Sequence, residues 1–343
     1  MKALYLDNGK LAIRDKNDDL VLGDDDVEIK IHTVGICGSD VHYYQHGRIG
    51  PFVVKAPMVL GHEASGIVTA IGKNVRHLRI GDRVCMEPGI PNLASHQSRS
   101  GFYNLDPEVR FWATPPVDGC LCEKVIHPAA FTFKLPDNVS FREGAMVEPL
   151  AIGMQSATKA GIKPGDIALV IGAGTIGVLT ALSALAGGCA EVIICDVVDE
   201  KLQVAKHYQG LHPVNSRTGD LLAKVNELTN EMGVDVLFEC SGAAAAIAEL
   251  TQYMAPGATA VLVGMPITPA PIDIVSAQAK EITFKTIFRY VNMYPRTIRL
   301  LASGKLDLTP LISAVYKFPQ SIEAFERAAS ANPNDIKLMI EME

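Results

Sequence analysis

The sequence IALVIGAGTIG, residues 167–177, joins a continuous apolar run to the pattern G-x-G-x-x-G. An uninterrupted apolar run of this length is typical of a strand buried on both faces of a parallel sheet. After it, Gly172 permits a tight turn, Gly174 lets the backbone approach an anion, and Gly177 allows a helix to pack closely. The first turn of that helix offers free N–H groups and a positive potential. The stretch therefore predicts a pyrophosphate site between a strand and a helix.

Asp196 stands nineteen residues after Gly177, at the end of the next apolar strand. A carboxylate at this place accepts hydrogen bonds from the ribose hydroxyls of an adenosine and repels a 2′-phosphate. No arginine occurs among residues 197–200, so the pattern favours NAD over NADP. The alternative is a glycine-rich turn followed by a surface aspartate. The predicted cofactor ligands are Gly172, Gly174, Thr175, Ile176, Gly177 and Asp196.

Apolar strands and helices alternate along the chain around this turn. We expect strands at 167–174, 191–196, 213–216, 234–242, 258–264 and 281–288. We expect helices at 151–161, 175–188, 199–210, 221–233 and 243–257. Such alternation predicts an α/β fold with a doubly wound parallel sheet.

The N-terminal part of the chain has a different pattern. Its strand-like runs, at 27–37, 64–72 and 82–88, are short and are separated by closely spaced Gly and Pro. Runs of this kind predict a compact β-barrel or a sandwich-like domain. The C-terminal stretch is mixed, with expected helices at 295–303 and 320–331 and further segments at 308–318 and 336–342.

The composition is that of a globular protein. The chain has 343 residues, which at about 150 residues per domain predicts two domains. A net charge of −7 without a basic block argues against nucleic-acid binding. No apolar run reaches the roughly 20 residues that span a bilayer, and the N-terminus lacks a signal-peptide pattern. Seven thinly spread cysteines do not form a disulfide framework, so we expect a cytoplasmic protein.

Four side chains in the β-rich half form a candidate metal site: Cys37, His62, Glu63 and Glu148. A thiolate, an imidazole and a carboxylate are ligands of a catalytic zinc that keeps one position open for water or substrate. The alternative is a buried cysteine and a satisfied histidine that never meet. The residues by themselves leave both interpretations open.

At these residues the chain resembles the zinc-dependent medium-chain dehydrogenases, and among them the sorbitol and xylitol dehydrogenase branch. The resemblance covers nearly the whole length. It rests on GICGSDVHYY (35–44), GHEASGIV (61–68), GDRVCMEPGIP (81–91), GFYNL (101–105), FWATPPVDG (111–119), MVEPLAIG (146–153), VIGAGTIG (170–177) and IFRYVNMYP (287–295). It implies a GroES-like β-rich catalytic domain, residues 1–149 and 286–343, interrupted by a Rossmann NAD-binding domain, residues 150–285.

The resemblance also implies a role for each motif residue. Cys37, His62 and Glu63 match the zinc ligands, and Glu148 matches a carboxylate that lies beside them or exchanges with Glu63 as a ligand. Ser39 and His42 match positions of the family's proton path. The polyol pocket or the nicotinamide end would be lined by Tyr43, Phe111, Thr114, Arg289 and Tyr290.

The chain departs from many of these relatives in the loop 92–106. Where those relatives place four cysteines around a second, structural zinc, this sequence has Asn92, Ser95, Ser98 and Asp106. None of these four residues supplies a thiolate. We therefore expect one catalytic zinc per subunit and no structural zinc.

The activity that the resemblance implies is NAD-dependent oxidation of a polyol, xylitol to D-xylulose or D-sorbitol to D-fructose, at a zinc-activated secondary alcohol. Alternatives are L-threonine or a simple secondary alcohol as the substrate and, more remotely, a catalytically silent binding protein. The proton is expected to leave through Glu148 or through Ser39 and His42, and the sequence does not choose between these routes. The resemblance further implies a homotetramer, with neither nucleic acid nor membrane as a partner.

Overall fold

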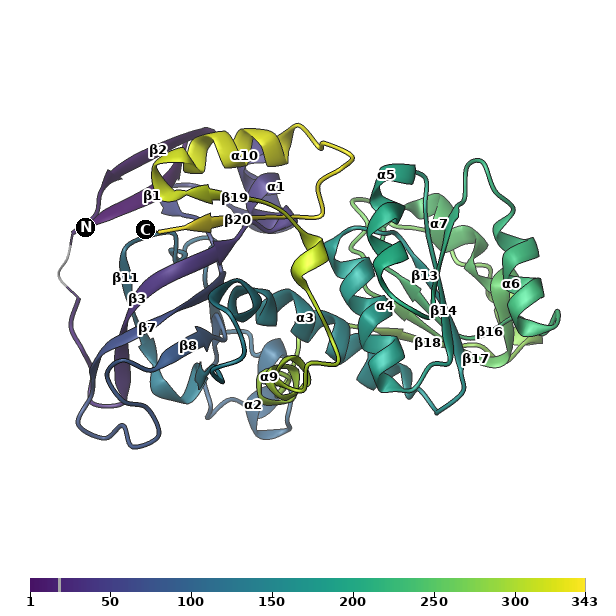
Figure 1. The fold of residues 1–343 in the computed structure, drawn as a ribbon, viewed down its shortest axis with the longest axis horizontal. Coiled ribbons are helices and arrows are strands. Elements are labelled where there is room, and N and C mark those ends of the chain that lie inside the picture. The colour runs from purple at the N-terminus through teal and green to yellow at the C-terminus, as the bar shows by residue number, and fades with distance from the viewer. Residues whose placement is uncertain (18–19, 343) are drawn as a thin grey trace. The chain divides into compact units, whose positions relative to one another are not determined.

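The structure is a computed structural model that describes residues 1–17 and 20–342 and divides the chain into two compact units (Figure 1). The first unit comprises Met1–Glu148 and Tyr294–Glu343. The second unit comprises Pro149–Met293. The first unit is therefore discontinuous in sequence, and the second is one continuous insertion.

Residues 286–293 belong to the second unit, whereas the family resemblance implied that they belong to the β-rich domain. Hydrogen bonds within the second unit account for this difference. Lys159 Nζ donates to the carbonyl of Thr286 at 3.0 Å. The amide of Val291 donates to Gln155 Oε1 at 3.5 Å. These contacts tie the segment to the C-terminal half of helix α3 (Phe141–Ala160).

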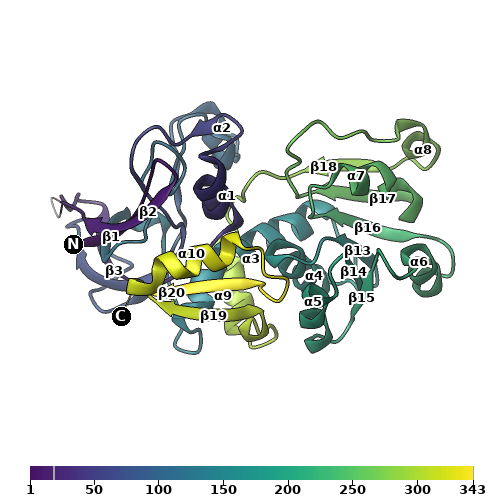
Figure 2. The same cartoon turned by 90° about the horizontal axis from the view of Figure 1, so that it is seen from above.

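The second unit contains a six-stranded sheet in the order β15-β14-β13-β16-β17-β18, and its pairings are parallel (Figure 2). Its strands are β13 (Ile167–Ile171), β14 (Glu191–Asp196), β15 (Leu211–Asn215), β16 (Val234–Glu239), β17 (Met254–Leu262) and β18 (Thr283–Thr286). The strand order reverses at β13, so the carboxyl ends of β13 and β16 border the crevice where doubly wound sheets bind ligands. The predicted doubly wound parallel sheet is confirmed.

Helices cover both faces of this sheet (Figure 1). They are α4 (Thr175–Gly187), α5 (Asp199–Leu202), α6 (Leu221–Thr229), α7 (Ala244–Glu249) and α8 (Ile274–Ala279). Three of them, α5, α6 and α7, are shorter than the sequence predicted, and α6 ends at Thr229 instead of residue 233. The helix that begins at Asp199 continues beyond Leu202 as a 3-10 helix. The predicted helix 243–257 ends early because Met254 already pairs with Val234 in the sheet.

The first unit is rich in strands, as its sequence predicted. The largest sheet has the order β12-β8-β7-β3-β20-β19, and β11 pairs with the first half of β3. Its strands are β3 (Asp26–Gly35), β7 (Glu63–Ile71), β8 (Arg83–Met86), β11 (Lys124–Pro128), β12 (Thr132–Lys134), β19 (Ile312–Lys317) and β20 (Lys337–Glu341). Smaller sheets pair β1 (Lys2–Asp7) with β2 (Lys10–Asp15) and β6 (Met58–Val59), β4 (Arg48–Ile49) with β5 (Phe52–Val53), and β9 (Gly89–Ile90) with β10 (Arg110–Phe111). Pairing of β3 with both β7 and β20 brings distant parts of the chain into one sheet.

Helices α1 (Gly38–His46), α2 (His96–Arg99), α9 (Tyr294–Ala302) and α10 (Ser321–Ala329) complete the first unit, together with the N-terminal part of α3. Helix α10 packs along β19 and β20 (Figure 2). Its Phe325 is fully buried in an apolar core with Leu4, Ile31 and Ile340. The C-terminal stretch therefore closes the core that the N-terminal strands begin.

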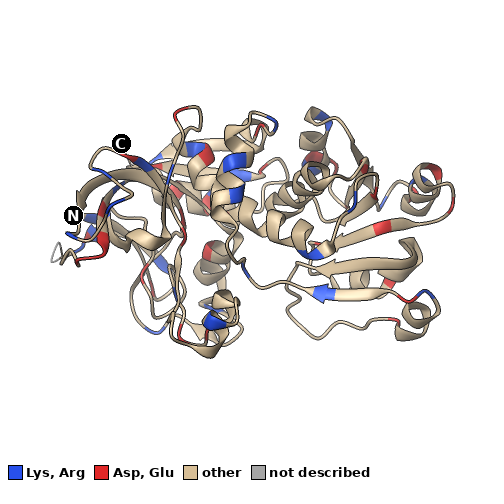
Figure 3. Cartoon of the chain, turned by 90° about the horizontal axis from the view of Figure 1, so that it is seen from below, with Lys and Arg blue, Asp and Glu red and all other residues tan. Residues whose placement is uncertain are grey.

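Positively and negatively charged residues are interspersed along the ribbon of both units (Figure 3). This distribution agrees with the net charge of −7 and the lack of a basic block in the sequence. In the described part of the chain, every helix is too short or too polar to cross a membrane.

Candidate active site

A thiol, an imidazole and a carboxylate converge where β3 meets β7. Cys37 follows the end of β3 and precedes α1, while His62 and Glu63 stand at the start of β7. Gly35 is the register partner of Glu63, so the ends of the two strands lie together. One ligand atom from each of Cys37, His62 and Glu63 lies within 4.8 Å of the other two. A Cβ atom at Gly35 would overlap the Glu63 carboxylate, so a side chain there would displace this carboxylate from its position.

Cys37, His62 and Glu63 suit a zinc ion, both by the donor atoms that they offer and by the residues that surround them. Thiolate, imidazole and carboxylate donors leave one position of a tetrahedral zinc open. The Nδ1 atom of His62 is buried without a hydrogen bond, and Asp40 Oδ2 lies 3.6 Å from it. Asp40 is fully buried and accepts hydrogen bonds from the amides of Cys37 at 3.2 Å and Gly61 at 3.1 Å. The carboxylate is thus fixed where it can orient a metal-ligating histidine.

Lys337 is the buried partner of Glu63. Its Nζ donates to Glu63 Oε2 at 2.6 Å and to the carbonyl of Ile36 at 3.0 Å. The two side chains are only 2 % and 1 % exposed. Burial by itself lowers the pKa of Lys337, but the Glu63 carboxylate holds that pKa above its usual range. Lys337 therefore compensates the charge of a buried carboxylate beside the candidate metal position.

Glu148 lies on α3, is 6 % exposed and falls outside the group of three ligand atoms. Its charge acts on Lys337 and on a second buried carboxyl, Glu87, which follows β8. Burial raises the pKa of Glu87 to about 7 against a hydrogen bond from Tyr103 Oη at 2.6 Å, and the charge of Glu148 adds to the rise. Glu148 is therefore linked electrostatically both to Lys337, the partner of Glu63, and to the buried carboxyl of Glu87.

The other predicted residues of the first unit have different surroundings. Phe111 is buried, and its ring centroid lies 5.6 Å from that of His62. Ser39 and His42 are half-buried on α1, three residues apart, and the ring of His42 lies 4.5 Å from the ring of His46. Tyr43 is buried in the apolar core of the unit. Thr114 is half-buried, and its amide donates to the carbonyl of Phe111 at 3.1 Å.

The turn after β13 has the shape of a phosphate cradle. Gly172 has a φ of +100°, which favours glycine. Gly174 caps α4 without a side chain, and a Cβ atom there would meet nothing within 4 Å. A Cβ atom at Gly177 would overlap the carbonyl oxygen of Gly172. The turn therefore packs against its helix only with glycine, and Gly174 leaves open space at the N-terminus of α4, where Thr175 and Ile176 form the first turn.

Asp196 is fixed at the end of β14. Its Oδ2 atom accepts a hydrogen bond from the amide of Ala173 at 2.8 Å, and its Oδ1 atom accepts one from the amide of Val198 at 3.0 Å. Each oxygen retains a further lone pair for a hydroxyl group. The carboxylate is therefore placed against the phosphate turn, where the sequence pattern predicted a ribose ligand.

A cavity of about 650 Å³ adjoins the same strand ends. It is lined by Ile171 and Cys195, by residues 216–222, and by part of α7. Its volume is in the range of small-molecule and cofactor sites. Arg217 is among the lining residues. The sequence gives no signal for Arg217, because this residue follows β15 and comes to the cavity only through the pairing of β15 with β14.

Arg289 and Tyr290 lie in the second unit. Arg289 has a left-handed backbone with a φ of +57°, and its guanidinium lies 4.8 Å from the ring centroid of Phe288. Tyr290 is almost fully buried.

The loop 92–106 is organised by hydrogen bonds among its own polar side chains. The carboxylate of Asp106 accepts from the amides of Asn92 and Glu108. Ser95 Oγ accepts from the amide of Ser98 at 3.2 Å, and the two serine hydroxyls lie 3.0 Å apart. The four residues Asn92, Ser95, Ser98 and Asp106 therefore all take part in hydrogen bonds of this loop.

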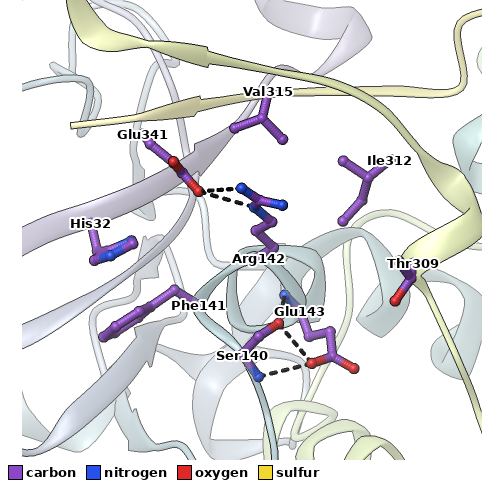
Figure 4. A pocket seen from close by; sticks show the side chains of 9 residues that line it. All are labelled: His32, Ser140, Phe141, Arg142, Glu143, Thr309, Ile312, Val315 and Glu341. Carbon is purple, nitrogen blue, oxygen red and sulfur yellow. Dashed lines mark hydrogen bonds and ion pairs between the residues drawn. The ribbon is translucent and has the colours of Figure 1, made fainter. Parts of the chain in front are cut away.

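A cavity of about 470 Å³ in the first unit is lined by other residues (Figure 4). Its charged side chains partner one another: Arg142 pairs with Glu341 at 2.8 Å, and Glu143 accepts hydrogen bonds from Ser140. The ring of His32 stacks on Phe141 at 3.9 Å. Because its charges are already paired, this cavity is a weaker candidate for ligand chemistry than the group at Cys37.

Comparisons with known proteins match both units. Residues 23–137 match the family described as "Alcohol dehydrogenase GroES-like domain", and residues 175–303 match "Zinc-binding dehydrogenase". The D-xylulose reductase of Morganella morganii is 76 % identical over 331 residues, covering 96 % of this chain and 98 % of that protein. The sorbitol dehydrogenase of Bos taurus is 43 % identical over 93 % of this chain and 89 % of its own. An Escherichia coli oxidoreductase/dehydrogenase of unknown specificity has a similar structure, with a TM-score of 0.94, 34 % identity and coverage of 99 % and 98 %.

Proposed function

The chain belongs to the zinc-binding dehydrogenases that carry an alcohol dehydrogenase GroES-like domain, and from this membership we propose that it oxidises a polyol at a secondary alcohol with NAD. The observation that carries the proposal is the convergence of Cys37, His62 and Glu63 in a chain that also has a dinucleotide turn. The names of the two relatives, D-xylulose reductase and sorbitol dehydrogenase, support polyols and ketoses as the substrate class.

In this proposal Cys37, His62 and Glu63 hold the zinc ion. Asp40 orients His62, and Lys337 restrains Glu63. When bound, zinc supplies a Lewis acid that lowers the pKa of an alcohol oxygen toward neutrality. The protein's part is to keep three donors in place and one position open.

Glu148 is the proposed acceptor of the hydroxyl proton. Its support is electrostatic: the charge of Glu148 acts on Lys337, whose ammonium contacts Glu63. A carboxyl group buried next to the ligand group can hold a proton until it is released. The route through Ser39 and His42 is the second possibility, and both residues lie on α1 directly after Cys37.

Glu148→Gln tests the proton route. We expect kcat to fall at least about a hundredfold, the low end of the usual range for removal of an acid–base group. The dissociation constant for NADH should stay within about twofold, because the cofactor turn is unaffected. His42→Ala is the matched variant for the other route. A larger loss of kcat in His42→Ala than in Glu148→Gln would favour Ser39 and His42 as the route.

NAD is the proposed hydride acceptor, and the second unit supplies its binding turn. Asp196 supports NAD over NADP, since a 2′-phosphate would meet a fixed carboxylate. The guanidinium of Arg217 lines the neighbouring cavity and is the group that would weaken this preference. Rates with NAD and NADP at equal concentration test the preference, and faster turnover with NADP would contradict it.

The proposed substrate contacts are Tyr43, Phe111, Thr114, Arg289 and Tyr290. Arg289 is also a proposed contact of the nicotinamide end of the cofactor. Their support is the family membership and, for Phe111, its position beside His62. Among polyols we propose xylitol, with D-xylulose as product, because the relative at 76 % identity is a D-xylulose reductase. D-Sorbitol, with D-fructose as product, is the second candidate.

Initial rates of NAD reduction with xylitol, D-sorbitol, L-threonine, 2-propanol and ethanol test the proposed activity. We expect the highest kcat/KM with xylitol, and a lower value with sorbitol. One extra carbon in a pocket changes the ratio by about 10- to 200-fold. Activity confined to threonine or the simple alcohols would contradict the polyol assignment.

For assembly we propose a homotetramer with one zinc ion per subunit, acting in the cytoplasm. Strand β18 ends the six-stranded sheet, and an edge strand offers unpaired backbone groups to a partner. The connection between β17 and β18 exposes Met265 and Ile267, the latter by 92 %. Light scattering should give about 147 kDa, four times 36.8 kDa. The seven free cysteines suit a reducing compartment.

A further inference from the structure

Glu239 is a fully buried carboxylate at the end of β16, on the edge of the sheet where the cofactor turn lies. Its Oε1 atom accepts hydrogen bonds from the amide of Ser241 at 2.9 Å, from the Ser241 hydroxyl, and from the amide of Gly242 at 3.1 Å. Its Oε2 atom also accepts from the Gly242 amide, at 3.0 Å. Within the described residues, no lysine, arginine or histidine forms an ion pair with it. The buried charge is therefore balanced by the N–H and O–H groups of the turn that follows it.

The same residue joins two strand ends. The backbone carbonyl of Glu239 accepts from the amides of Val263 and Gly264, both at 2.8 Å, directly after β17. A Cβ atom at Gly264 would lie 2.9 Å from Glu239 Oε2 and would overlap the amide nitrogen of Gly242. Gly242 has a φ of +67°. The carboxylate is therefore enclosed by backbone, and the turn 240–242 has little freedom to move away from it.

This turn packs directly on the phosphate cradle. A Cβ atom at Gly172 would lie 3.0 Å from the amide nitrogen of Ser241 and 3.2 Å from the carbonyl carbon of Cys240. The side chain of Cys240 also faces Gly177, at 3.6 Å from a Cβ built there. Two of the three glycines in the pattern therefore contact the 240–242 turn. A shift of that turn would move the wall against which the cradle rests.

We propose that Glu239 is a positioning residue for the dinucleotide, because its carboxylate sets the 240–242 turn against Gly172 and so fixes the shape of the phosphate cradle. This inference rests on the proposed binding of NAD. Hydrogen bonds to a carboxylate are stronger than those between neutral groups. A neutral side chain would hold the turn less firmly, and the cost would appear in cofactor affinity.

Glu239→Gln tests the inference with little change in volume. The NH₂ group of glutamine, in place of Oε2, would face the N–H group of Gly242. Two donors would then meet, and the hydrogen bond that Oε2 accepts from Gly242 would be lost. We expect the dissociation constant for NADH, measured by fluorescence titration of the full chain, to rise at least about tenfold. The KM for NAD should rise in parallel, with kcat at saturating NAD within about twofold and zinc content unchanged.

Asp235→Asn is the matched control. Asp235 lies on the same strand, at its other end, and its Oδ2 atom accepts from the amide of Ile167 at 2.9 Å. Like Glu239, Asp235 is a carboxylate of β16 that accepts a hydrogen bond from a backbone amide. Its partner amide belongs to the start of β13, at the edge of the sheet opposite to the cofactor turn. We expect its NADH affinity to equal that of the wild type, even if its thermal midpoint falls as far as that of Glu239→Gln.

Three outcomes separate the possibilities. Unchanged NADH affinity in Glu239→Gln, or an equal loss in Asp235→Asn, would overturn the positioning role. If Glu239→Gln does not fold, Glu239→Asp keeps the charge, shortens its reach, and is expected to show the same rise in dissociation constant at a wild-type zinc content. Absence of NADH binding by the wild-type chain would instead contradict the proposed function.

Discussion

Glu63 shows how one side chain in this protein depends on several distant ones. Its carboxylate approaches Cys37 and His62 on one side and contacts the ammonium of Lys337 on the other. Without a cation, a carboxylate this deeply buried would cost several kcal/mol. Lys337 therefore places a compensating positive charge against Glu63 at the point where this carboxylate faces Cys37 and His62.

Replacing Lys337 by Met should make folding of the first unit depend on zinc. The zinc-stripped variant leaves Glu63 buried and unpaired, which costs about 3–5 kcal/mol in unfolding free energy. Added zinc should restore part of this loss, because ligation replaces the ion pair. Thermal unfolding with and without zinc measures the difference.

Lys317→Met is the control for that variant. Lys317 pairs with Glu341 at 3.0 Å, but its side chain is largely exposed. A pair of this kind contributes about 1 kcal/mol or less. An equal zinc dependence in both variants would contradict the role given to Lys337.

Glu87→Gln should remove a pH dependence from the stability of the first unit. Burial raises the pKa of Glu87 to about 7 from 4.5, so the native state favours the protonated form. Its stabilising contribution is complete below pH 4.5 and is lost as the pH rises to about 7. For a shift of this size the loss is on the order of 3 kcal/mol. The variant should match the wild type near pH 4.5 and exceed it at pH 8.

Urea unfolding followed by tryptophan fluorescence checks this expectation. Trp112 is the single tryptophan of the chain and lies buried in the first unit, 4.5 Å from the ring of His127. Burial lowers the pKa of His127 to about 4, which gives an opposite slope that both proteins share. The exposed Glu123→Gln serves as the control. A variant no more stable than the wild type at pH 8 would show that Glu87 does not titrate as described.

At the scale of elements, the position of helix α4 depends on the glycine turn that precedes it. The helix begins at Thr175 against the carbonyl of Gly172, and Gly177 makes that approach possible. Any side chain at Gly177 would push the helix away from the turn. The N–H groups that α4 offers to an anion would then leave their positions.

Gly177→Ala should therefore weaken NADH binding by at least about tenfold, equivalent to 1.4 kcal/mol. Gly187→Ala, at the last position of the same helix, is the control. A Cβ atom there would lie 3.4 Å from Ile162 Cδ1, which is an ordinary contact. Fluorescence titration of both variants with NADH measures the difference. Equal affinities would mean that the turn adjusts to an added methyl group.

At the scale of the whole molecule, the two units carry different parts of the proposed chemistry. The first holds Cys37, His62 and Glu63, and the second holds the phosphate cradle and Asp196. Each unit has its own apolar core. Metal binding and dinucleotide binding can therefore be measured separately on the same protein.

Elemental analysis of the purified chain should give one zinc atom per subunit. The loop 92–106 has no thiolate to hold a second one, and its polar side chains bond to the loop itself. Cys37→Ser should reduce the content to near zero while NADH still binds. A content of two zinc atoms, or zinc that survives in Cys37→Ser, would contradict the single site.

Much of the second unit could be predicted from the sequence alone. Its strands and helices alternate, and the contacts that form the turn at 172–177 are close in sequence. Local spacing therefore specified the parallel sheet, the cradle and the place of Asp196. The helix expected up to residue 257 was wrong at its C-terminal end, because pairing of Met254 with Val234 prevailed over helical preference.

The sequence by itself determined which residue types are candidates for the proposed chemistry: a cysteine, a histidine, carboxylates and a glycine-rich turn. The tertiary structure decided how they are supported. Lys337 reaches Glu63 from 274 residues away because β20 pairs with β3 and β3 pairs with β7. Glu239 lies outside the glycine pattern in sequence, and the turn that its carboxylate holds packs on Gly172. No local pattern encodes such supports, since burial and strand register arise only when distant segments come together.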